Sequence, residues 1–357
     1  MADLDQQLAP GVERPDPDSG RRPGTGHALL RYVRENWIFG VLVAIVVIFS
    51  IASSHFLTQS NWINTSDTAT EVLLLAVGET FVIVSGGIDL SVGAVLGLSG
   101  MAGGWVMQHF FSHAGLPTGS PALVTAIGFA VTIAVGVIAG LVNGVLIAGY
   151  DIPPFVVTLG TLGIATGLAD LVSNGQELST IPATIGNIGN DNIGGWLPVP
   201  VLIALACTVI GAVALARTRF GAVTYAIGDN REAARRAGIS DGRHLLKVYT
   251  LAGTLAGVAS ITVMSRLGAA SPTSGSNDEL NAIAAVVIGG ASLFGGRGTV
   301  VGALIGTCII AVLLTGLIII NVPSFWQTVT VGVVLIAAVY VDRAGAGERG
   351  GLRRMLR

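Results

Sequence analysis

The run ALVTAIGFAVTIAVGVIAGLVNGVLIA, residues 122–148, contains no charged side chain. It is longer than the roughly 20 apolar residues that a helix needs to cross a bilayer, whose hydrocarbon core is about 30 Å thick. Every backbone N–H and C=O group in such a segment must be paired within the segment, which predicts a helix. The rest of the chain has the same character, because 52% of its residues are hydrophobic, 11% are charged and the mean hydropathy is +0.74. The composition therefore indicates a protein that crosses a membrane several times.

Ten segments of this kind are expected to form transmembrane helices. They are residues 37–53, 70–86, 91–107, 122–148, 154–172, 197–216, 248–266, 282–293, 301–320 and 325–341. Glycines recur four residues apart in several of them, a spacing that lets helix backbones approach closely in a bilayer. Such sets are Gly136/Gly140/Gly144, Gly163/Gly167 and Gly253/Gly257. We therefore predict an all-α polytopic membrane protein with about ten transmembrane helices and glycine-rich breaks.

The positive charges indicate which side of the membrane each end faces. With the N-terminus in the cytoplasm, Arg266 is the only one of the 19 Lys and Arg residues that falls on the far side. Lys and Arg accumulate on the cytoplasmic side of membrane proteins, so both termini are expected to be cytoplasmic. The segment 282–293 is short enough for a half-helix, but the same rule predicts that it crosses, because otherwise the C-terminal arginines would face outward.

Two polar tails are expected to flank a membrane domain at residues 29–342. Residues 1–28 are rich in Asp, Pro, Gly and Arg and contain too little apolar surface to offset chain entropy, which predicts a disordered cytoplasmic tail. Residues 343–357 are expected to form a basic cytoplasmic tail. No apolar run follows a basic start near Met1, so a cleaved secretory signal is not expected.

The polar segment 217–247 contains seven of the 19 Lys and Arg residues, which places it in the cytoplasm. Within it the sequence predicts a short helix that has Asp229 or Asn230 as its N-cap. Glu232 would lie in the first turn, where a negative charge is favourable, and Gly238 would end the helix.

This short helix would have two kinds of surface. Ala233, Ala234 and Ala237 would share a face of small residues, and arginines would cover much of the rest. These arginines are Arg231, Arg235 and Arg236. Such a helix suits insertion into a groove on another protein. The alternative is a cytoplasmic loop whose arginines only enforce the topology.

A second feature is the sequence GGIDLSVG at residues 86–93. The paired glycines Gly86 and Gly87 interrupt a helix, and Asp89 or Ser91 can restart it by accepting a hydrogen bond from a free backbone N–H group. A break at this depth is tolerated only where protein or water surrounds it, so the segment is expected to face the bundle interior or a pathway. Asp89 is either a helix cap or a contact for a transported solute.

Glu79 lies in the middle of an otherwise apolar segment. An ionisable group at that depth is costly, and it is a functional hypothesis by default. Two interpretations stay open. A neutral Glu79 that is hydrogen-bonded to Thr80, Asn143 or a backbone carbonyl would tie helices together, whereas a solvated Glu79 would line a transport route.

Two polar segments, 173–179 and 271–279, are expected on the outer face. They supply hydroxyl, amide and carboxylate groups that suit sugar hydroxyls or the docking of a soluble partner. The residues singled out are Asn174, Gln176, Asn277, Asp278 and Glu279. Outer loops are polar in any membrane protein, so this composition alone separates neither use from an ordinary loop.

Several functions are not supported by the sequence. No glycine-rich loop precedes a Lys-Ser or Lys-Thr pair, so the chain lacks a P-loop and is not expected to hydrolyse ATP. His109 and His113 are four residues apart, but no third ligand is nearby, so no metal site is expected. Cys207 and Cys308 are widely separated residues in apolar segments, which gives neither a metal-ligand pattern nor a disulfide framework, and we expect both to be small core residues. No catalytic set of side chains and no nucleic-acid surface are evident, which indicates that the chain is not an enzyme.

Four stretches resemble one family of transport proteins. They are AVGETFVIVSGGIDLSVG (76–93), VTLGTLGIATGL (157–168), YAIGDNREAARRAGI (225–239) and ELNAIAAVVIGGASLFGGRGTVVGALIG (279–306). In order and spacing they resemble the permease subunits of ribose-type monosaccharide ABC importers, in the superfamily that also contains branched-chain amino acid permeases. The resemblance covers roughly residues 37–342.

The resemblance implies a multi-pass protein of the bacterial inner membrane, embedded in lipid, that translocates a monosaccharide by alternating access. It also implies three protein partners: an ATPase subunit that binds ATP and Mg, a periplasmic or lipid-anchored sugar-binding protein, and a second permease copy in a homodimer or heterodimer. This chain would bind no cofactor itself. The residues implied to couple it to the ATPase are Glu232, Ala233, Ala234, Arg235, Arg236 and Gly238.

Two other functions compete with this one. An ABC permease for branched-chain amino acids or another small polar solute belongs to the same superfamily, but the motifs GGIDLSVG and ELNAIAAVVIGG favour sugars. A proton-coupled secondary transporter would use Glu79 and Asp89 as relay groups and would need no ATP.

Overall fold

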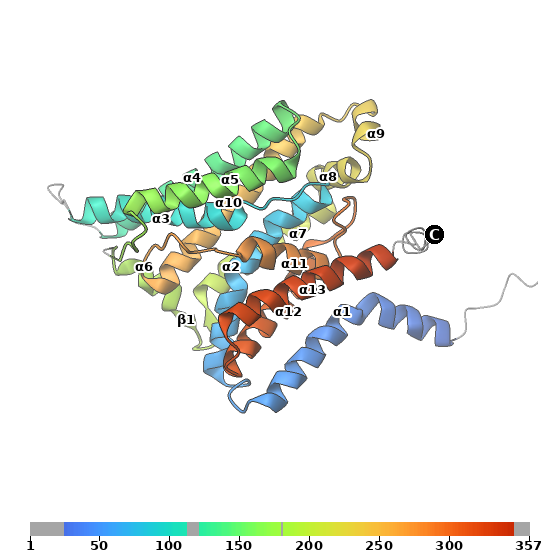
Figure 1. Ribbon diagram of the computed structural model, residues 1–357, viewed down its shortest axis with the longest axis horizontal. Coiled ribbons are helices and arrows are strands. Elements are labelled where there is room, and N and C mark those ends of the chain that lie inside the picture. The colour runs from blue at the N-terminus through green and yellow to red at the C-terminus, as the bar shows by residue number, and fades with distance from the viewer. Residues whose placement is uncertain (1–24, 113–120, 180, 346–357) are drawn as a thin grey trace, which may run out of the picture.

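The computed structural model describes residues 25–112, 121–179 and 181–345 (Figure 1). The predicted tail at 1–28 and the basic tail at 343–357 lie mostly outside these residues, and His113 lies outside them too. The described residues form thirteen helices and two short strands. The described part of the chain is therefore mostly helical, as the apolar segments indicate.

Nine long helices overlap nine of the expected transmembrane segments. They are α1 (Thr25–Ala52), α2 (Gln59–Val84), α3 (Val92–Ser112), α4 (Pro121–Gly149), α5 (Pro154–Ser173), α7 (Val199–Arg217), α10 (Asp241–Leu267), α12 (Val300–Ile319) and α13 (Ser324–Gly345). Among the described helices, α4, α5, α7, α10 and α12 are each long and apolar enough to cross a membrane. The polytopic membrane architecture follows from these helices.

The remaining elements are short. They are α6 (Thr184–Asn190), α8 (Arg219–Asp229), α9 (Arg231–Arg236), α11 (Asp278–Ile288), and the strands β1 (Asn192–Ile193) and β2 (Leu197–Pro198), which pair antiparallel. In Figure 1, α8 and α9 lie at the same end of the molecule as the last turn of α13.

The boundaries predicted for 282–293 differ from those of α11. The helix begins earlier, at Asp278, and it ends at Ile288 because Gly289 and Gly290 follow, the latter with φ of +90°. Its 11 residues span about 16 Å, roughly half of a hydrocarbon core. Gly289 lies against Gly302 in the first turn of α12, so α11 ends level with the start of α12, and the rest of a crossing must come from the non-helical residues before Asp278.

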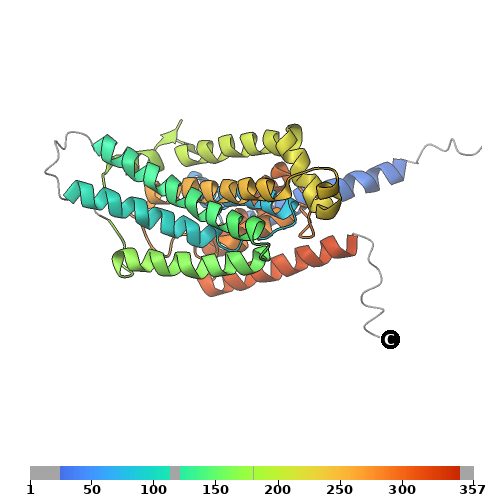
Figure 2. The same cartoon turned by 90° about the horizontal axis from the view of Figure 1, so that it is seen from above.

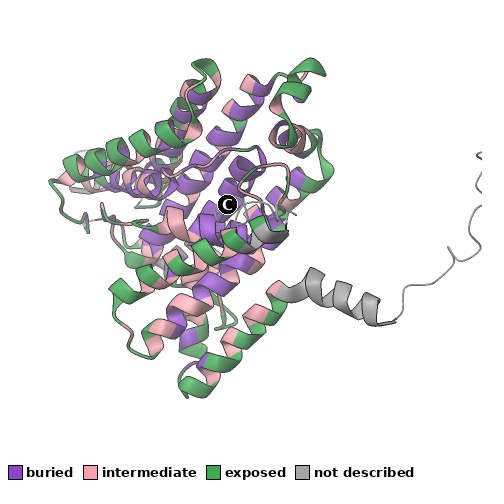
Figure 3. Cartoon of the chain, turned by 45° about the vertical axis from the view of Figure 1, so that its right-hand side comes forward, coloured by how far each residue is buried: buried purple, intermediate pink, exposed green. Residues whose placement is uncertain are grey.

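Helix α2 forms the centre of the bundle, and every residue from Val72 to Val84 is buried. It packs against α7, α10, α11 and α12. Figure 3 shows the buried residues gathered in the middle of the molecule and the exposed residues on the outer helices. This central helix carries Glu79 and leads directly into the predicted break.

Two of the predicted glycine sets pack helices together. Helices α4 and α10 lie so close that a methyl group added at Gly136 would overlap the carbonyl oxygen of Gly253. In contrast, methyl groups added at Gly163 or Gly167 of α5 would meet nothing within 4 Å. The exposed glycine face of α5 thus has no packing partner among the described residues. Figure 2 shows α5 and α13 along the same side of the molecule.

The segment before α11 folds inward. A methyl group at Gly93, in the first turn of α3, would overlap the carbonyl oxygen of Gly275 and the carboxylate of Glu279. One at Gly97 would lie 2.8 Å from the carbonyl oxygen of Ser274. The N-terminal ends of α3 and α11 therefore meet inside the bundle.

Candidate functional site

The break between α2 and α3 is held by hydrogen bonds to buried carboxylates. The backbone N–H of Asp89 donates to Glu79 Oε1 at 3.1 Å. Asp89 Oδ1 in turn accepts from the backbone N–H of Ser91 at 2.9 Å and from its hydroxyl at 2.6 Å. Glu79 is 0% exposed, and Asp89 and Ser91 are buried as well. Gly86, with φ of +87°, lets the chain turn before this point.

Two further helices join the same network through Asn143 of α4, which is 1% exposed. Its Nδ2 donates to Ser91 Oγ at 2.9 Å, and its Oδ1 accepts from Thr161 Oγ1 of α5 at 2.6 Å. Four predicted residues, Glu79, Asp89, Ser91 and Asn143, thus lie in one chain of contacts. The network connects α2, α3, α4 and α5.

The partners of Glu79 differ from those expected. Thr80 donates to the carbonyl oxygen of Ala76 instead, and Glu79 accepts from a backbone N–H group rather than donating to a carbonyl. Its second oxygen and the hydroxyl of Tyr249 are buried and have no hydrogen-bond partner among the described residues. Sequence reasoning missed Thr161 and Tyr249, although polar side chains in apolar segments are the signal that identified Glu79.

The ends of the predicted cytoplasmic helix are confirmed in α9. Asn230 Oδ1 accepts from the backbone N–H of Ala233 at 2.9 Å, which makes Asn230 the N-cap. After the helix, Gly238 has φ of +83°, and the N–H of Ile239 donates to the carbonyl oxygen of Ala234 at 3.0 Å. Asp229 is the last residue of α8, a helix that the sequence did not predict separately.

The small-residue face of α9 is divided between the interior and the solvent. Ala234 is 5% exposed and packs in a cluster with Ile227 of α8 and Leu245 of α10. Ala233 and Ala237 are exposed. The three alanines therefore do not form one exposed face, because α9 lies on α8 and α10 with Ala234 turned inward.

The arginines of α9 have two different roles. Arg231 Nε lies 2.6 Å and an Arg235 guanidinium nitrogen lies 2.9 Å from Oδ2 of Asp241, the first residue of α10. The hydrogen bond that Arg235 donates to Asp241, together with the negative charge of Asp241, raises the pKa of Arg235 above its usual value. Arg236 instead pairs with Glu232 at 3.2 Å on the exposed side. The inner pairs hold α9 against α10, and the outer pair is exposed.

The two polar segments expected on the outer face lie side by side. Leu178 and Ala270 exchange backbone hydrogen bonds of 2.9 and 3.0 Å. Asn174 ends α5 with φ of +54°, and both Asn174 and Gln176 are exposed. This segment presents polar side chains at the surface.

Residues at the start of α11 are arranged differently. Asn277 is exposed and has φ of +71°, whereas Asp278 and Glu279 lie in the first turn of α11 and are partly buried. Asp278 accepts a hydrogen bond from Asn281 at 3.1 Å. Glu279 lies against Gly93 of α3. These two carboxylates are therefore turned toward the bundle interior.

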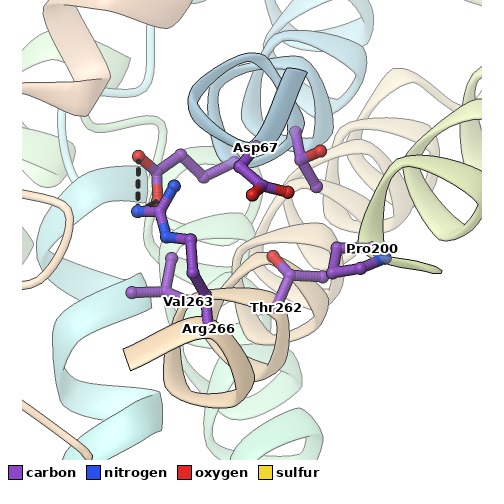
Figure 4. A pocket seen from close by; sticks show the side chains of 7 residues that line it. Asp67, Pro200, Thr262, Val263 and Arg266 are labelled. Atoms are coloured by element: carbon purple, nitrogen blue, oxygen red, sulfur yellow. Dashed lines mark hydrogen bonds and ion pairs between the residues drawn. The ribbon is translucent and has the colours of Figure 1, made fainter. Parts of the chain in front are cut away.

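An ion pair at the other end of α2 was not predicted. Arg266 of α10 pairs with Glu71 of α2 at 3.2 Å, beside a small pocket that Asp67 also lines. Figure 4 shows Asp67 and Arg266 facing each other across this pocket. In the described residues, His, Cys, Asp and Glu form no group that could hold a metal ion.

Comparisons with known proteins identify a family and several relatives that are similar to this chain. Residues 61–339 match the family model described as the permease component of branched-chain amino acid transport systems. The ribose import permease protein of Bacillus subtilis is 40% identical over 85% of this chain and 90% of its own length. The D-allose transport system permease protein of Escherichia coli is 37% identical over 85% and 90%. The xylose transport system permease protein of Haemophilus influenzae is 33% identical over 85% and 96%. No solved structure matches the chain.

Proposed function

This chain belongs to the family of permease components of branched-chain amino acid transport systems, and from this premise we propose that it is the transmembrane subunit of a monosaccharide ABC importer. The observation that carries the proposal is its similarity, over 85% of the chain, to permeases named for ribose, allose and xylose. The chain is a multi-pass protein of the bacterial cell membrane. It supplies the path for the solute, and ATP with Mg would bind on a separate subunit.

The orientation and the partners belong to the same proposal. Both termini and the α8–α9 region lie in the cytoplasm, and ten segments cross the membrane, with the non-helical residues that precede Asp278 supplying the part of the eighth crossing that α11 does not span. The ATPase docks on α9 through the exposed Glu232, Ala233 and Arg236. A sugar-binding protein docks on the outer side, where Asn174 and Gln176 are exposed.

A second permease copy would complete the path. Helices α3 and α11 both begin inside the bundle, after non-helical segments. Non-helical backbone is tolerated in a membrane only where protein or water surrounds it. Contacts place α3 beside α5 and α11 beside α13, the two helices along one side of the molecule (Figure 2). Helix α5 also carries Gly163 and Gly167, the glycines that have no packing partner among the described residues. The solute would therefore pass between two copies, along the faces formed by α5 and α13.

The mechanism is alternating access driven from the cytoplasmic side. ATP binding would close the ATPase subunits and move α9, and the inner ion pairs would carry this movement to α10 through Asp241. The buried network around Asp89 and Asn143 would keep the broken end of α3 in place during the movement. Nothing in this sequence of steps requires a chemical reaction on the permease itself.

Reconstituted transport tests the proposal. The chain would be co-purified with its ATPase subunit and its binding protein, placed in liposomes and supplied with labelled ribose, allose or xylose. We expect uptake of a monosaccharide that requires ATP hydrolysis and stops with a non-hydrolysable analogue. ATP-driven uptake of leucine alone would refute the sugar assignment. Uptake by the isolated chain under a proton gradient would refute the importer and favour Glu79 and Asp89 as relay groups.

A further inference from the structure

A glycine-rich loop lies between α11 and α12. Residues 289–299, here called the glycine loop, include four glycines with positive φ, a conformation that other residues rarely adopt. These are Gly290, Gly295, Gly296 and Gly298. The N–H of Ser292 donates to the carbonyl oxygen of Arg297 at 3.0 Å and closes the loop across its base. Phe294 lies within this closed turn.

Two hydrogen bonds fasten the loop to other helices. The N–H of Gly296 donates to the carbonyl oxygen of Val84, the last residue of α2, at 2.9 Å. The hydroxyl of Tyr225 in α8 donates to the carbonyl oxygen of Gly298 at 2.7 Å. These hydrogen bonds tie the loop to α2 and α8, two elements far from it in the sequence.

Phe294 is presented to the surface by this loop. Its side chain is 66% exposed, and the guanidinium of Arg343 in α13 lies 5.7 Å from the centre of its ring. Arg297 of the same loop is exposed. Aromatic and arginine side chains on a pre-formed support are the residues that most often dominate binding energy at protein interfaces.

The loop is continuous with the surface that α9 presents. A methyl group at Gly295 would lie 2.7 Å from the carbonyl oxygen of Gly228, and one at Gly296 would lie 3.1 Å from the Cα of Asp229. Asn230, the N-cap of α9, is the next residue. Figure 1 shows the loop between α8 and the end of α13, on the side of the molecule where α9 projects.

We propose that the glycine loop is a second docking contact for the ATPase subunit that α9 engages, with Phe294 entering an apolar pocket whose rim is acidic. The inference rests on the proposed function, because it names a further contact of the same partner. Continuity with α9 argues for a protein occupant, and the two arginines around Phe294 argue for an acidic rim. Side chains that anchor proteins at the lipid headgroups are typically Trp and Tyr, which have a polar end that Phe lacks.

A second contact changes what the partner can move. A contact at α9 alone reaches α10 through Asp241. The glycine loop adds a direct connection to the end of α2 at Val84, next to the break, and to the start of α12. Closure of the ATPase subunits would then act on α10 through α9, and at the same time on the end of α2 and the start of α12 through the glycine loop.

Photocrosslinking in the assembled importer tests this inference. Benzoylphenylalanine would replace Phe294, Ala233 of α9, or Phe325, which is 73% exposed at the opposite end of α13 and serves as the control. After irradiation in membranes, adducts would be identified by mass spectrometry. We expect positions 294 and 233 to crosslink to the same ATP-binding subunit and position 325 not to do so.

The other outcomes separate the two ideas. A crosslink from position 233 combined with only lipid adducts, or none, at position 294 would overturn the second contact and leave the proposed function standing. No crosslink from either position would overturn both. In addition, Phe294→Ser is expected to weaken ATPase association about ten-fold without changing the melting temperature. Phe325→Ser should leave association unchanged, and an unaltered affinity of the Phe294→Ser protein would also overturn the inference.

Discussion

Gly228 lies where three backbone segments converge, and replacing it tests this contact directly. A methyl group at this position of α8 would overlap the carbonyl oxygen of Val84 and would lie 2.6 Å from the backbone nitrogen of Gly296. Those two atoms are joined by a hydrogen bond of 2.9 Å. The neighbouring atoms belong to the backbone and cannot rotate away, so Gly228→Ala must separate α8 from α2 and from the glycine loop.

The expected magnitude combines three effects. Forcing a methyl group into a packed site destabilises a protein by about 1–3 kcal/mol. Losing the Gly296 hydrogen bond would leave a buried donor or acceptor unpaired and would cost about 1–3 kcal/mol more. The better helix propensity of Ala offsets about 1 kcal/mol of this loss. A net loss of roughly 3 kcal/mol corresponds to a decrease in melting temperature of about 4 °C for a chain of 357 residues.

Thermal unfolding of the purified protein in detergent, followed by tryptophan fluorescence, measures this decrease. The matched control is Gly40→Ala in α1, where an added methyl group meets nothing within 4 Å. It gains the same helix propensity without a clash, so its melting temperature should equal or slightly exceed that of the wild type. If Gly228→Ala melts at or above the wild-type temperature, α8, α2 and the glycine loop are not in the contact described, and the reasoning fails.

Three other substitutions have distinct expected results. Asn143→Leu removes two buried hydrogen bonds and should lower the stability in denaturant titrations by about 2–4 kcal/mol, more than Thr161→Val, which removes one. Glu71→Gln should lower the melting temperature because it leaves the charge of Arg266 half-buried and unpaired. Adding Arg266→Met should recover part of this loss, and no recovery would contradict the pairing. Arg236→Glu should leave the melting temperature unchanged, because its pair is exposed, but should reduce ATPase co-purification; a large stability loss would contradict the exposed position.

The features that the sequence predicted correctly depend on local chemistry. Long apolar segments indicate helices whatever surrounds them, since unpaired backbone groups are not tolerated in lipid. The N-cap at Asn230 and the turn at Gly238 depend only on residues within one helical turn. The glycine spacing in α4 and α10 predicted close packing, but it also suggested packing for Gly163 in α5, where the structure has none.

The features that were missed depend on contacts between distant segments. Glu79 accepts its hydrogen bond from a backbone group ten residues away, and a search among side chains does not find such a partner. The pairing of Arg266 with Glu71 joins residues separated by 195 positions. The burial of Ala234 depends on where α8 and α10 lie, because helical spacing groups residues on a face without indicating what that face contacts.

The positions of these contacts explain why movement at α9 cannot stay local. Asp241 joins α9 to the first turn of α10. Helix α10 lies against α4, and their backbones are so close at Gly136 that the two helices cannot slide past each other unless they separate. Helix α4 carries Asn143, which holds Ser91 at the start of α3. Packed interfaces of this kind have discrete arrangements rather than continuous ones. A displacement of α9 that exceeds what the α10 contact tolerates must therefore either break the pairs at Asp241 or shift α4, and with it the broken end of α3.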